Sequence, residues 1–588
     1  MKYSLAVISV FIILSCQNET HFDNPSKKIH GQLNPLFQQI EKFEHAPQDS
    51  LYRGYHTRSK WKSSSYEQQQ EDNRTILAFI DKLQIIENKE LNQQEVISKK
   101  VMLIKLRNMA DRFRYNNNLI PFNAEGGFYN RMTYILPNLP FNTTQDYLNY
   151  LNWLPQYNQV LEENIELLKM GIQKGVVAPK IVVKNTLELL KPWVQLDIEN
   201  SIFHSPFKKL PPTIDETDRA LILKRSKTEI SKLLDTYSKI NDLFKKEYLA
   251  KAGEKPGISF IPQGNEFYEN RVKHFTTLPL SADSVHQLGL AEVKRIRKAM
   301  EDIISELGFE GSFADFLAFL RTDEQFYPKT EQELLNYASW LSKKAEGQLP
   351  KIFNTLYTLP FTVEPVPLSI APTYTTGRYV GGSWESQKAG IYWVNTFNLP
   401  SRTLYTMPAL TLHEAVPGHH LQNAIAAELK DLPKFRTSYY ISAFGEGWGL
   451  YSEFLGEEMG MYETPYDLFG RYTYEMWRAC RLVVDTGIHD KGWTREKALN
   501  YMAENTALSM HEVTTEIDRY IGWPGQALSY KVGEIKIRSL RKLAETELGV
   551  DFNLGEFHDV ILRNGSIPLA VLEEQVKNYI DQKLATDQ

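Results

Sequence analysis

Neither sign of charge dominates this sequence. Lys and Arg together number 67 and Asp and Glu 72, so 588 residues carry a formal net charge of only -5. This balance gives no reason to expect nucleic acid or an anionic membrane surface as a partner. The hydrophobic content of 42% and the aromatic content of 12% allow a large core in a chain longer than one ordinary compact domain.

Long hydrophobic runs are also missing from the sequence. The apolar stretch Leu5 to Leu14 spans about 10 residues, which is too short to cross a bilayer as a helix. Lys2 precedes it, and it ends in Ile13-Leu14-Ser15-Cys16, which resembles a lipoprotein signal-peptide box. We therefore predict that residues 1–15 are removed, that Cys16 carries a lipid anchor to a bacterial cell-envelope membrane (periplasmic or surface), and that residues 16–34 form a polar tether. Plain secretion with an incidental cysteine is the alternative.

Cysteine is scarce, with Cys480 as the second of only two. If Cys16 is lipidated, the remaining cysteine cannot form an intrachain disulfide, so the fold must be stable in an oxidising compartment without crosslinks. Cys480 lies in the apolar run MWRACRLVV. We predict a buried core residue there and not a nucleophile.

The fold class predicted from the pattern is mainly α. Apolar residues recur at 3–4 spacing through 66–86, 185–196, 218–249, 283–308 and 331–357. Segment 361–398 is the exception, because it is β-branched, aromatic and punctuated by glycine, and it predicts a small sheet just before the motif described next. A peptide substrate would pair with an exposed strand edge, and 389–395 is the candidate edge strand; an ordinary buried strand is the alternative.

The run HEAVPGHHLQ, which begins at His413, contains the candidate metal-binding residues. His413 is predicted to be the first ligand of a metal ion, and Glu414 beside it is predicted to activate a metal-bound water. The short motif His-Glu-x-x-His places two histidines on one helix face. Here the fifth position is Pro417, which cannot ligate and disfavours a continuous helix.

The second ligand has two candidates, His419 and His420. In a regular helix the position six residues after His413 is about 240° round the axis, and the position after seven residues lies roughly 10 Å further along. The helix must therefore bulge or break at Pro417-Gly418, where glycine has the required freedom. A two-residue bulge would bring His419 into place, so we prefer His419. His420 is the alternative second ligand, or a side chain beside the ligands or facing substrate.

The third ligand is expected to be a carboxylate on a following helix. In FGEGWGLYSE, Glu446 and Glu453 lie seven positions apart, on one helix face. We predict that Glu446 binds the metal and that Glu453 orients a ligand from behind. A solvated acidic face is the alternative reading of these two residues.

Segment 508–533 is predicted to bind substrate. A Tyr hydroxyl opposite the metal can stabilise a developing oxyanion, and Tyr530 is the candidate. A cation is needed to read a C-terminal carboxylate; Arg519, beside Tyr520, is the candidate, with Arg378 in reserve. His511-Glu512 looks like a second metal pair, but Thr515 occupies the position where a second histidine would be needed.

Three blocks, HEAVPGHHLQ, GEGWGLYSE and RYIGWPGQALSYKVG, resemble the signatures of the bacterial family labelled domain of unknown function 885. The resemblance covers roughly residues 35–585. It implies a large helical zinc-metallopeptidase fold with a substrate channel and a small β-sheet next to the metal site, similar in architecture to neurolysin, angiotensin-converting enzyme and thermostable bacterial carboxypeptidases. Their motif is His-Glu-x-Gly-His, and aligning its Gly-His on Gly418-His419 also favours His419.

We therefore expect a zinc metallopeptidase that cleaves short peptides, with carboxypeptidase or dipeptidyl-carboxypeptidase action as the suggested mode and residues 35–588 as one helical domain. Its small β region is expected at 361–398, its metal site at 407–456 and its substrate segment at 508–533. Zn²⁺ is the expected cofactor, oligopeptides are the expected partners, and the oligomeric state stays open. The alternatives are a non-catalytic peptide-binding lipoprotein, which would have no use for Glu414, and a metal-dependent amidase on non-peptide substrates.

Overall fold

Helices make up most of the structure, a computed structural model that describes residues 33–45, 61–368 and 370–586. The predicted mainly α class is confirmed. The signal peptide 1–15, Cys16 and most of the tether lie outside the described residues. The helices are α1 (Leu33–His45), α3 (Tyr66–Ile85), α4 (Gln93–Arg114), α5 (Met132–Ile135), α6 (Thr144–Lys174), α7 (Lys180–Val194), α8 (Glu216–Asp242), α9 (Leu249–Lys251), α10 (Gly264–Thr276), α11 (Ala282–Glu306), α12 (Phe313–Thr322), α13 (Glu331–Glu346), α14 (Met407–Glu414), α15 (His419–Glu428), α16 (Lys434–Ser438), α17 (Ser442–Glu458), α18 (Pro465–His489), α19 (Arg495–Asn505), α20 (Met510–Gly522), α21 (Ser529–Leu548), α22 (Leu554–Leu562) and α23 (Leu569–Thr586).

Local sequence explains where several of these helices begin and end. Reciprocal capping boxes begin α6 at Thr143, α18 at Thr464 and α20 at Ser509. The third residue of α20 is Glu512, so the apparent metal pair His511-Glu512 is a helix cap. Helix α13 ends at Glu346, well short of the predicted end at 357, because Gly347 and the nearby Pro350 interrupt the apolar period.

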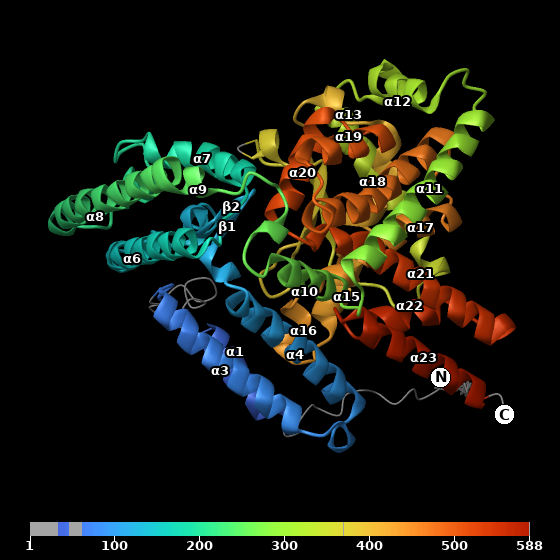
Figure 1. Cartoon of the computed structure of the whole chain (residues 1–588), viewed down its shortest axis with the longest axis horizontal. Coiled ribbons are helices and arrows are strands. Elements are labelled where there is room, and N and C mark those ends of the chain that lie inside the picture. The colour runs from blue at the N-terminus through green and yellow to red at the C-terminus, as the bar shows by residue number, and fades with distance from the viewer. Residues whose placement is uncertain (1–32, 46–60, 369, 587–588) are drawn as a thin grey trace, which may run out of the picture.

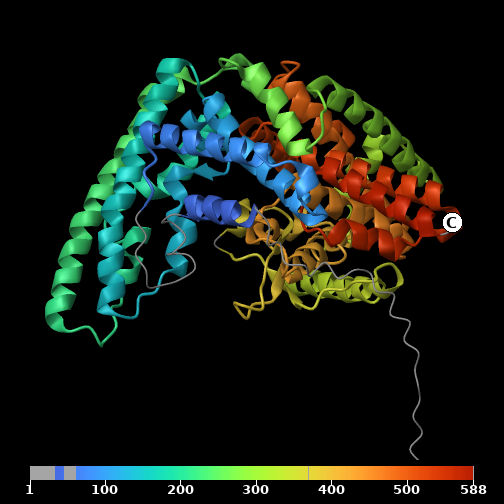
Figure 2. The same ribbon diagram turned by 90° about the horizontal axis from the view of Figure 1, so that it is seen from below.

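Two large groups of helices stand out, with α1, α3 and α4, in blue, lying together below them (Figure 1). Helices α6 to α9, in teal and green, lie together at one end, and α11 to α23, in green to red, fill the other. The quarter-turn view shows α6 and α8 running side by side as a long projection (Figure 2). Among the described residues, no helix combines the length and apolar character needed to cross a membrane.

The small sheet that segment 361–398 predicts is present. Strands β3 (Phe361–Pro365), β4 (Gly377–Val380) and β5 (Gly390–Val394) form it in the order β3-β5-β4. Strand β5 is parallel to β3 and antiparallel to β4. The expectation that 389–395 offers an open edge is wrong, because β5 is hydrogen-bonded on both sides. The edge strand next to the candidate site is β4.

Close helix packing holds the helices of the candidate site together. Helix α17 lies against α21, and a Cβ added at Gly447 would come 2.6 Å from the Gly533 Cα. Helix α18 packs on α11 and buries Cys480 completely, as its apolar setting predicts. These contacts place α14, α17, α18 and α21 around one point, where the motif residues meet.

Candidate metal centre

The motif helix breaks where Pro417 requires it. Helix α14 ends at Glu414, and α15 begins at His419. At Gly418 a Cβ would lie 1.9 Å from the His413 carbonyl oxygen, so only glycine lets the chain turn back this tightly. The break swings His419 round to the side of His413.

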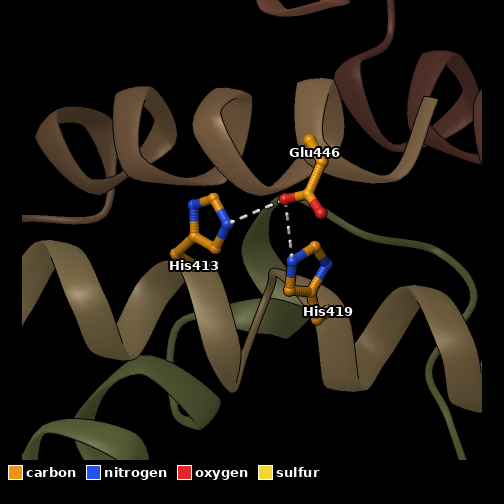
Figure 3. Close-up of side chains that lie close together, drawn as sticks. All are labelled: His413, His419 and Glu446. Atoms are coloured by element: carbon orange, nitrogen blue, oxygen red, sulfur yellow. Dashed lines mark ion pairs between the residues drawn. The ribbon is translucent and has the colours of Figure 1, made fainter. Parts of the chain in front are cut away.

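His413, His419 and Glu446 converge on one point (Figure 3). One ligand atom from each lies within 4.8 Å of the others. Glu446 Oε2 is 3.6 Å from His413 Nε2 and 3.4 Å from His419 Nε2. His413 comes from α14, His419 from α15 and Glu446 from α17. Two imidazole nitrogens and a carboxylate form a donor set that can hold a divalent metal ion.

Glu453 holds the imidazole of His413 from behind. Its Oε1 lies 2.7 Å from His413 Nδ1. A carboxylate only accepts, so Nδ1 carries a hydrogen, and Nε2 is the nitrogen that faces Glu446 and His419. Gly449 makes room for the ring, because a Cβ there would lie 2.7 Å from Nε2.

The electrostatics around His413 and Glu446 favour a bound cation. Burial disfavours the imidazolium of His413, but Glu446 and Glu453 outweigh burial and raise its pKa to about 9. Burial also opposes the charge on Glu446, yet contacts with His413 and His419 hold its pKa well below the ordinary value. A site where carboxylates draw positive charge onto buried imidazoles fits a bound metal cation.

His420 lies apart from this cluster. Its Nε2 is 3.0 Å from the carbonyl oxygen of Leu359 and its Nδ1 is 3.3 Å from the Tyr379 hydroxyl. Burial lowers its pKa to about 4. Both ring nitrogens are therefore occupied, and His420 packs the sheet against α15 in place of the metal-binding role considered for it.

Glu414 lies next to the cluster at the edge of the sheet. The Tyr379 N–H of β4 donates to Glu414 Oε2 over 2.8 Å, and the side chain is only half-buried. One carboxylate oxygen is thus fixed while the other has no hydrogen bond of its own in the described part of the chain. This arrangement suits a group that accepts and returns a proton.

Tyr530 reaches the same region from the start of α21. It is half-buried, and the Arg481 guanidinium carbon lies 4.3 Å from its ring centre. Burial and Glu446 raise the pKa of Tyr530, against the influence of Arg481 and Arg519. The phenol therefore stays protonated at neutral pH and can donate a hydrogen bond.

The three residues predicted to bind substrate are placed differently. Tyr520 is fully buried, and its hydroxyl accepts from Arg481 Nε at 2.7 Å and donates to Glu516 at 2.7 Å. Arg519 donates to Glu516 at 3.0 Å and to Gln526 at 2.6 Å. Both side chains are thus held by protein groups, and their contact with substrate stays a prediction, whereas Arg378 is exposed on β4.

Sequence reasoning missed Tyr440, whose hydroxyl donates to Glu446 Oε1 over 2.9 Å. It also missed Arg481, beneath Tyr530, and the Tyr379 N–H that fixes Glu414. Tyr440 lies just before α17 and has no motif of its own. Arg481 lies in the helical run around Cys480. An arginine on the buried face of that run was the sequence signal that could have identified it.

Comparisons with known proteins agree with this fold. A family model described as "Bacterial protein of unknown function (DUF885)" matches residues 47–576. The structure of a "putative lipoprotein" from Colwellia psychrerythraea is similar, with 28% identity, a TM-score of 0.85, and coverage of 94% of this chain and 99% of that one.

A "putative lipoprotein of unknown function" from Shewanella oneidensis has the same fold at 17% identity. Its TM-score is 0.70, and the match covers 92% of this chain and 98% of that one. No curated protein matches this chain.

Proposed function

This chain belongs to DUF885, a bacterial family of unknown function. From the geometry of its site, we propose that it is a zinc-dependent hydrolase of peptide bonds in short peptides. The observation that carries the proposal is the meeting of His413, His419 and Glu446 within 4.8 Å, beside Glu414. Two imidazoles and one carboxylate match the ligand set of hydrolytic zinc sites, which keep one position open for water.

His413, His419 and Glu446 would hold the zinc ion. When bound there, zinc supplies a Lewis acid that acidifies water at neutral pH. Glu453 keeps His413 in the tautomer that exposes Nε2. Tyr440 holds the other oxygen of Glu446 and so limits its rotation. These two contacts support a preformed site, because outer partners of this kind fix the orientation of ligands.

Glu414 would act as the general base and then as the general acid. The Tyr379 N–H fixes one carboxylate oxygen. The other oxygen accepts a proton from water and returns it to the departing amine. Tyr530 would donate its hydroxyl to the oxygen that gains negative charge during attack, where a fixed donor contributes most.

Strand β4 would align the substrate. Its inner side pairs with β5, and the Tyr379 N–H points away from β5 toward Glu414. An extended peptide can add to such an edge by main-chain hydrogen bonds. Binding at β4 brings a peptide bond beside Glu414, which is why peptides are the proposed substrates.

We also propose that the protein is exported and anchored at Cys16. The box at residues 13–16 supports this. Two similar structures come from proteins described as lipoproteins, and this supports it as well.

A peptide panel tests the activity. The zinc-loaded soluble form, starting after Cys16, is mixed with short peptides, and products are identified by mass spectrometry. We expect cleavage, and we expect Glu414→Gln to lower the rate by about 10²–10⁴-fold while zinc stays bound. Full activity in Glu414→Gln would contradict the proposed role of Glu414 as general base and general acid. Binding of peptides without cleavage would favour a binding lipoprotein, and cleavage of non-peptide amides alone would favour an amidase.

A further inference from the structure

Three arginines approach Tyr530, and two of them are already engaged. Arg481 and Arg519 share the carboxylate of Glu516, each with a nitrogen–oxygen distance of 3.0 Å. Arg481 also donates to the Tyr520 hydroxyl, and Arg519 donates to Gln526. Both guanidinium groups are buried or nearly so, and their geometry is set by protein groups.

Arg378 differs from both. It is exposed, and within the described residues no carboxylate lies in ion-pair distance of it. Its guanidinium carbon lies 5.4 Å from the ring centre of Tyr374. The surrounding protein partly desolvates its guanidinium, which opposes the charge, but Tyr374, Glu414, Tyr530 and Glu125 raise its pKa, so these four groups lie close enough to act on it. Tyr374 takes up part of the hydrogen-bonding capacity of this guanidinium. A guanidinium has five N–H donors, so others remain for a ligand.

The direction of Arg378 follows from the strand. Neighbouring residues of a strand point to opposite faces. Gly377 faces Leu410 of α14, since a Cβ there would lie 3.2 Å from the Leu410 side chain. Tyr379 points the same way and reaches His420. Arg378 therefore projects from the other face of the sheet, on the side of Tyr374 and Tyr530.

We propose that Arg378 binds a carboxylate of the substrate within one or two residues of the bond that is cleaved. A planar guanidinium recognises carboxylate through two parallel hydrogen bonds. Arg378 directly precedes Tyr379, whose N–H marks the position of Glu414, and strands advance only about 3.3 Å per residue. The inference rests on the proposed function and specifies its substrates as peptides with a nearby carboxylate, either the C-terminus or an acidic side chain.

The test compares three peptides of otherwise equal sequence. One has a free C-terminus, the second is amidated, and the third is amidated but ends in Glu. Their binding to the zinc-loaded Glu414→Gln chain is measured by calorimetry, so that no turnover intervenes, and their cleavage is measured with the unmodified chain. Each measurement is repeated with Arg378→Gln, with Arg378→Lys, and with Arg74→Gln as a control at an arginine 65% exposed on α3.

We expect one carboxylate-bearing peptide to bind about 10- to 100-fold more tightly than the plain amide, the range of a charged hydrogen-bonded pair. Arg378→Gln should abolish that preference, Arg378→Lys should keep part of it, and Arg74→Gln should keep it all. Preference for the free C-terminus would identify a carboxypeptidase-type site, and preference for the terminal Glu amide would identify an acidic side-chain pocket.

Two results would overturn the inference. One is equal binding of all three peptides, and the other is a carboxylate preference that survives in Arg378→Gln. Failure of the proposed function looks different, because the carboxylate preference would then remain in the binding data while no peptide is cleaved.

Discussion

At the scale of single residues, the candidate metal centre depends as much on the partners of its ligands as on the ligands. Glu453 is fully buried and lies 2.7 Å from His413 Nδ1, and Arg478 lies 3.8 Å from the same carboxylate oxygen. The carboxylate fixes which nitrogen of His413 carries the hydrogen. Its loss would free the imidazole to adopt the wrong tautomer.

Glu453→Gln should therefore weaken zinc binding by about 10- to 100-fold without unfolding the chain. The amide keeps the shape but not the negative charge that favours a cation in this pocket. Competition with a coloured chelator measures the affinity. Glu457→Gln changes a 38% exposed acid on the same helix and should leave the affinity unchanged; equal effects of the two variants would refute the orienting role.

Asp485 is a second buried acid with a distinct signature. It accepts from the Tyr268 hydroxyl at 2.6 Å and from the Gly525 N–H at 3.1 Å. Burial raises its pKa to about 7, although both hydrogen bonds and Arg519 act in the opposite direction. The folded chain thus holds a proton that the unfolded chain releases near pH 4.

This difference in proton binding predicts a pH dependence of stability. Because the folded state binds the extra proton, the free energy of unfolding falls as pH rises from about 4 to about 7. Asp485→Asn mimics the neutral acid, so its advantage over the unmodified chain should grow by about 2–3 kcal/mol between pH 5 and pH 8. Denaturant unfolding at the two pH values measures it. Asp302→Asn, at a 62% exposed site, serves as the control; parallel pH curves for Asp485→Asn and the unmodified chain would contradict this account.

The sequence was informative about residues where chemistry dictates spacing. Pro417 ruled out an ordinary helical pair and pointed to a break that would turn His419 toward His413. The sequence contained no signal for Tyr440 or the Tyr379 N–H, because those contacts arise only when a loop packs on α17 and a strand packs on α14. Likewise the sequence did not reveal the partners of Tyr520 and Arg519, because only the packing of α20 on α18 brings Glu516 and Arg481 to them.

At the scale of elements, the site depends on how closely α17 approaches α21. These helices carry Glu446 and Tyr530, and they touch through Gly447 and Gly533. A Cβ at Gly533 would lie 2.1 Å from the Ala443 carbonyl oxygen, a contact that only movement of a helix can relieve. The distance between these helices thus fixes the separation of a proposed ligand from the proposed oxyanion donor.

Gly533→Ala should lower the free energy of unfolding by about 1–3 kcal/mol, the usual cost of overpacking. It should also weaken zinc binding, because Glu446 must move with α17. Thermal unfolding and chelator competition provide the two readouts. Gly347→Ala is the control, since its Cβ would meet the nearest atom at 3.4 Å. A fully stable Gly533→Ala chain would show that the helices are not in close contact.

Element types followed from local pattern more reliably than element limits and neighbours did. Apolar spacing predicted α3, α8 and α11, and β-branched composition predicted the small sheet. The pattern of 389–395 could not say which strands flank it, because strand order is a property of the whole sheet. Composition alone therefore does not distinguish the central strand β5 from the edge strand β4.

At the scale of the whole molecule, the proposed location at a membrane is through a lipid on Cys16, the last residue of the box at 13–16. Cys16→Ser should move the protein from the membrane fraction to the soluble fraction of the cell envelope. Cell fractionation and immunoblotting measure this. Cys480→Ser, at a buried core cysteine, should leave the location unchanged. Membrane association that persists in Cys16→Ser would show that another part of the chain holds the protein there.

The central claim is that His413, His419 and Glu446 form one zinc site. The most direct measurement is elemental analysis of the mature chain, purified without chelators, beside His413→Ala, Glu446→Ala and His420→Ala. We predict about one zinc per chain, lost in the first two variants and kept in His420→Ala. A chain without metal, or one whose zinc survives both ligand substitutions, would contradict the account.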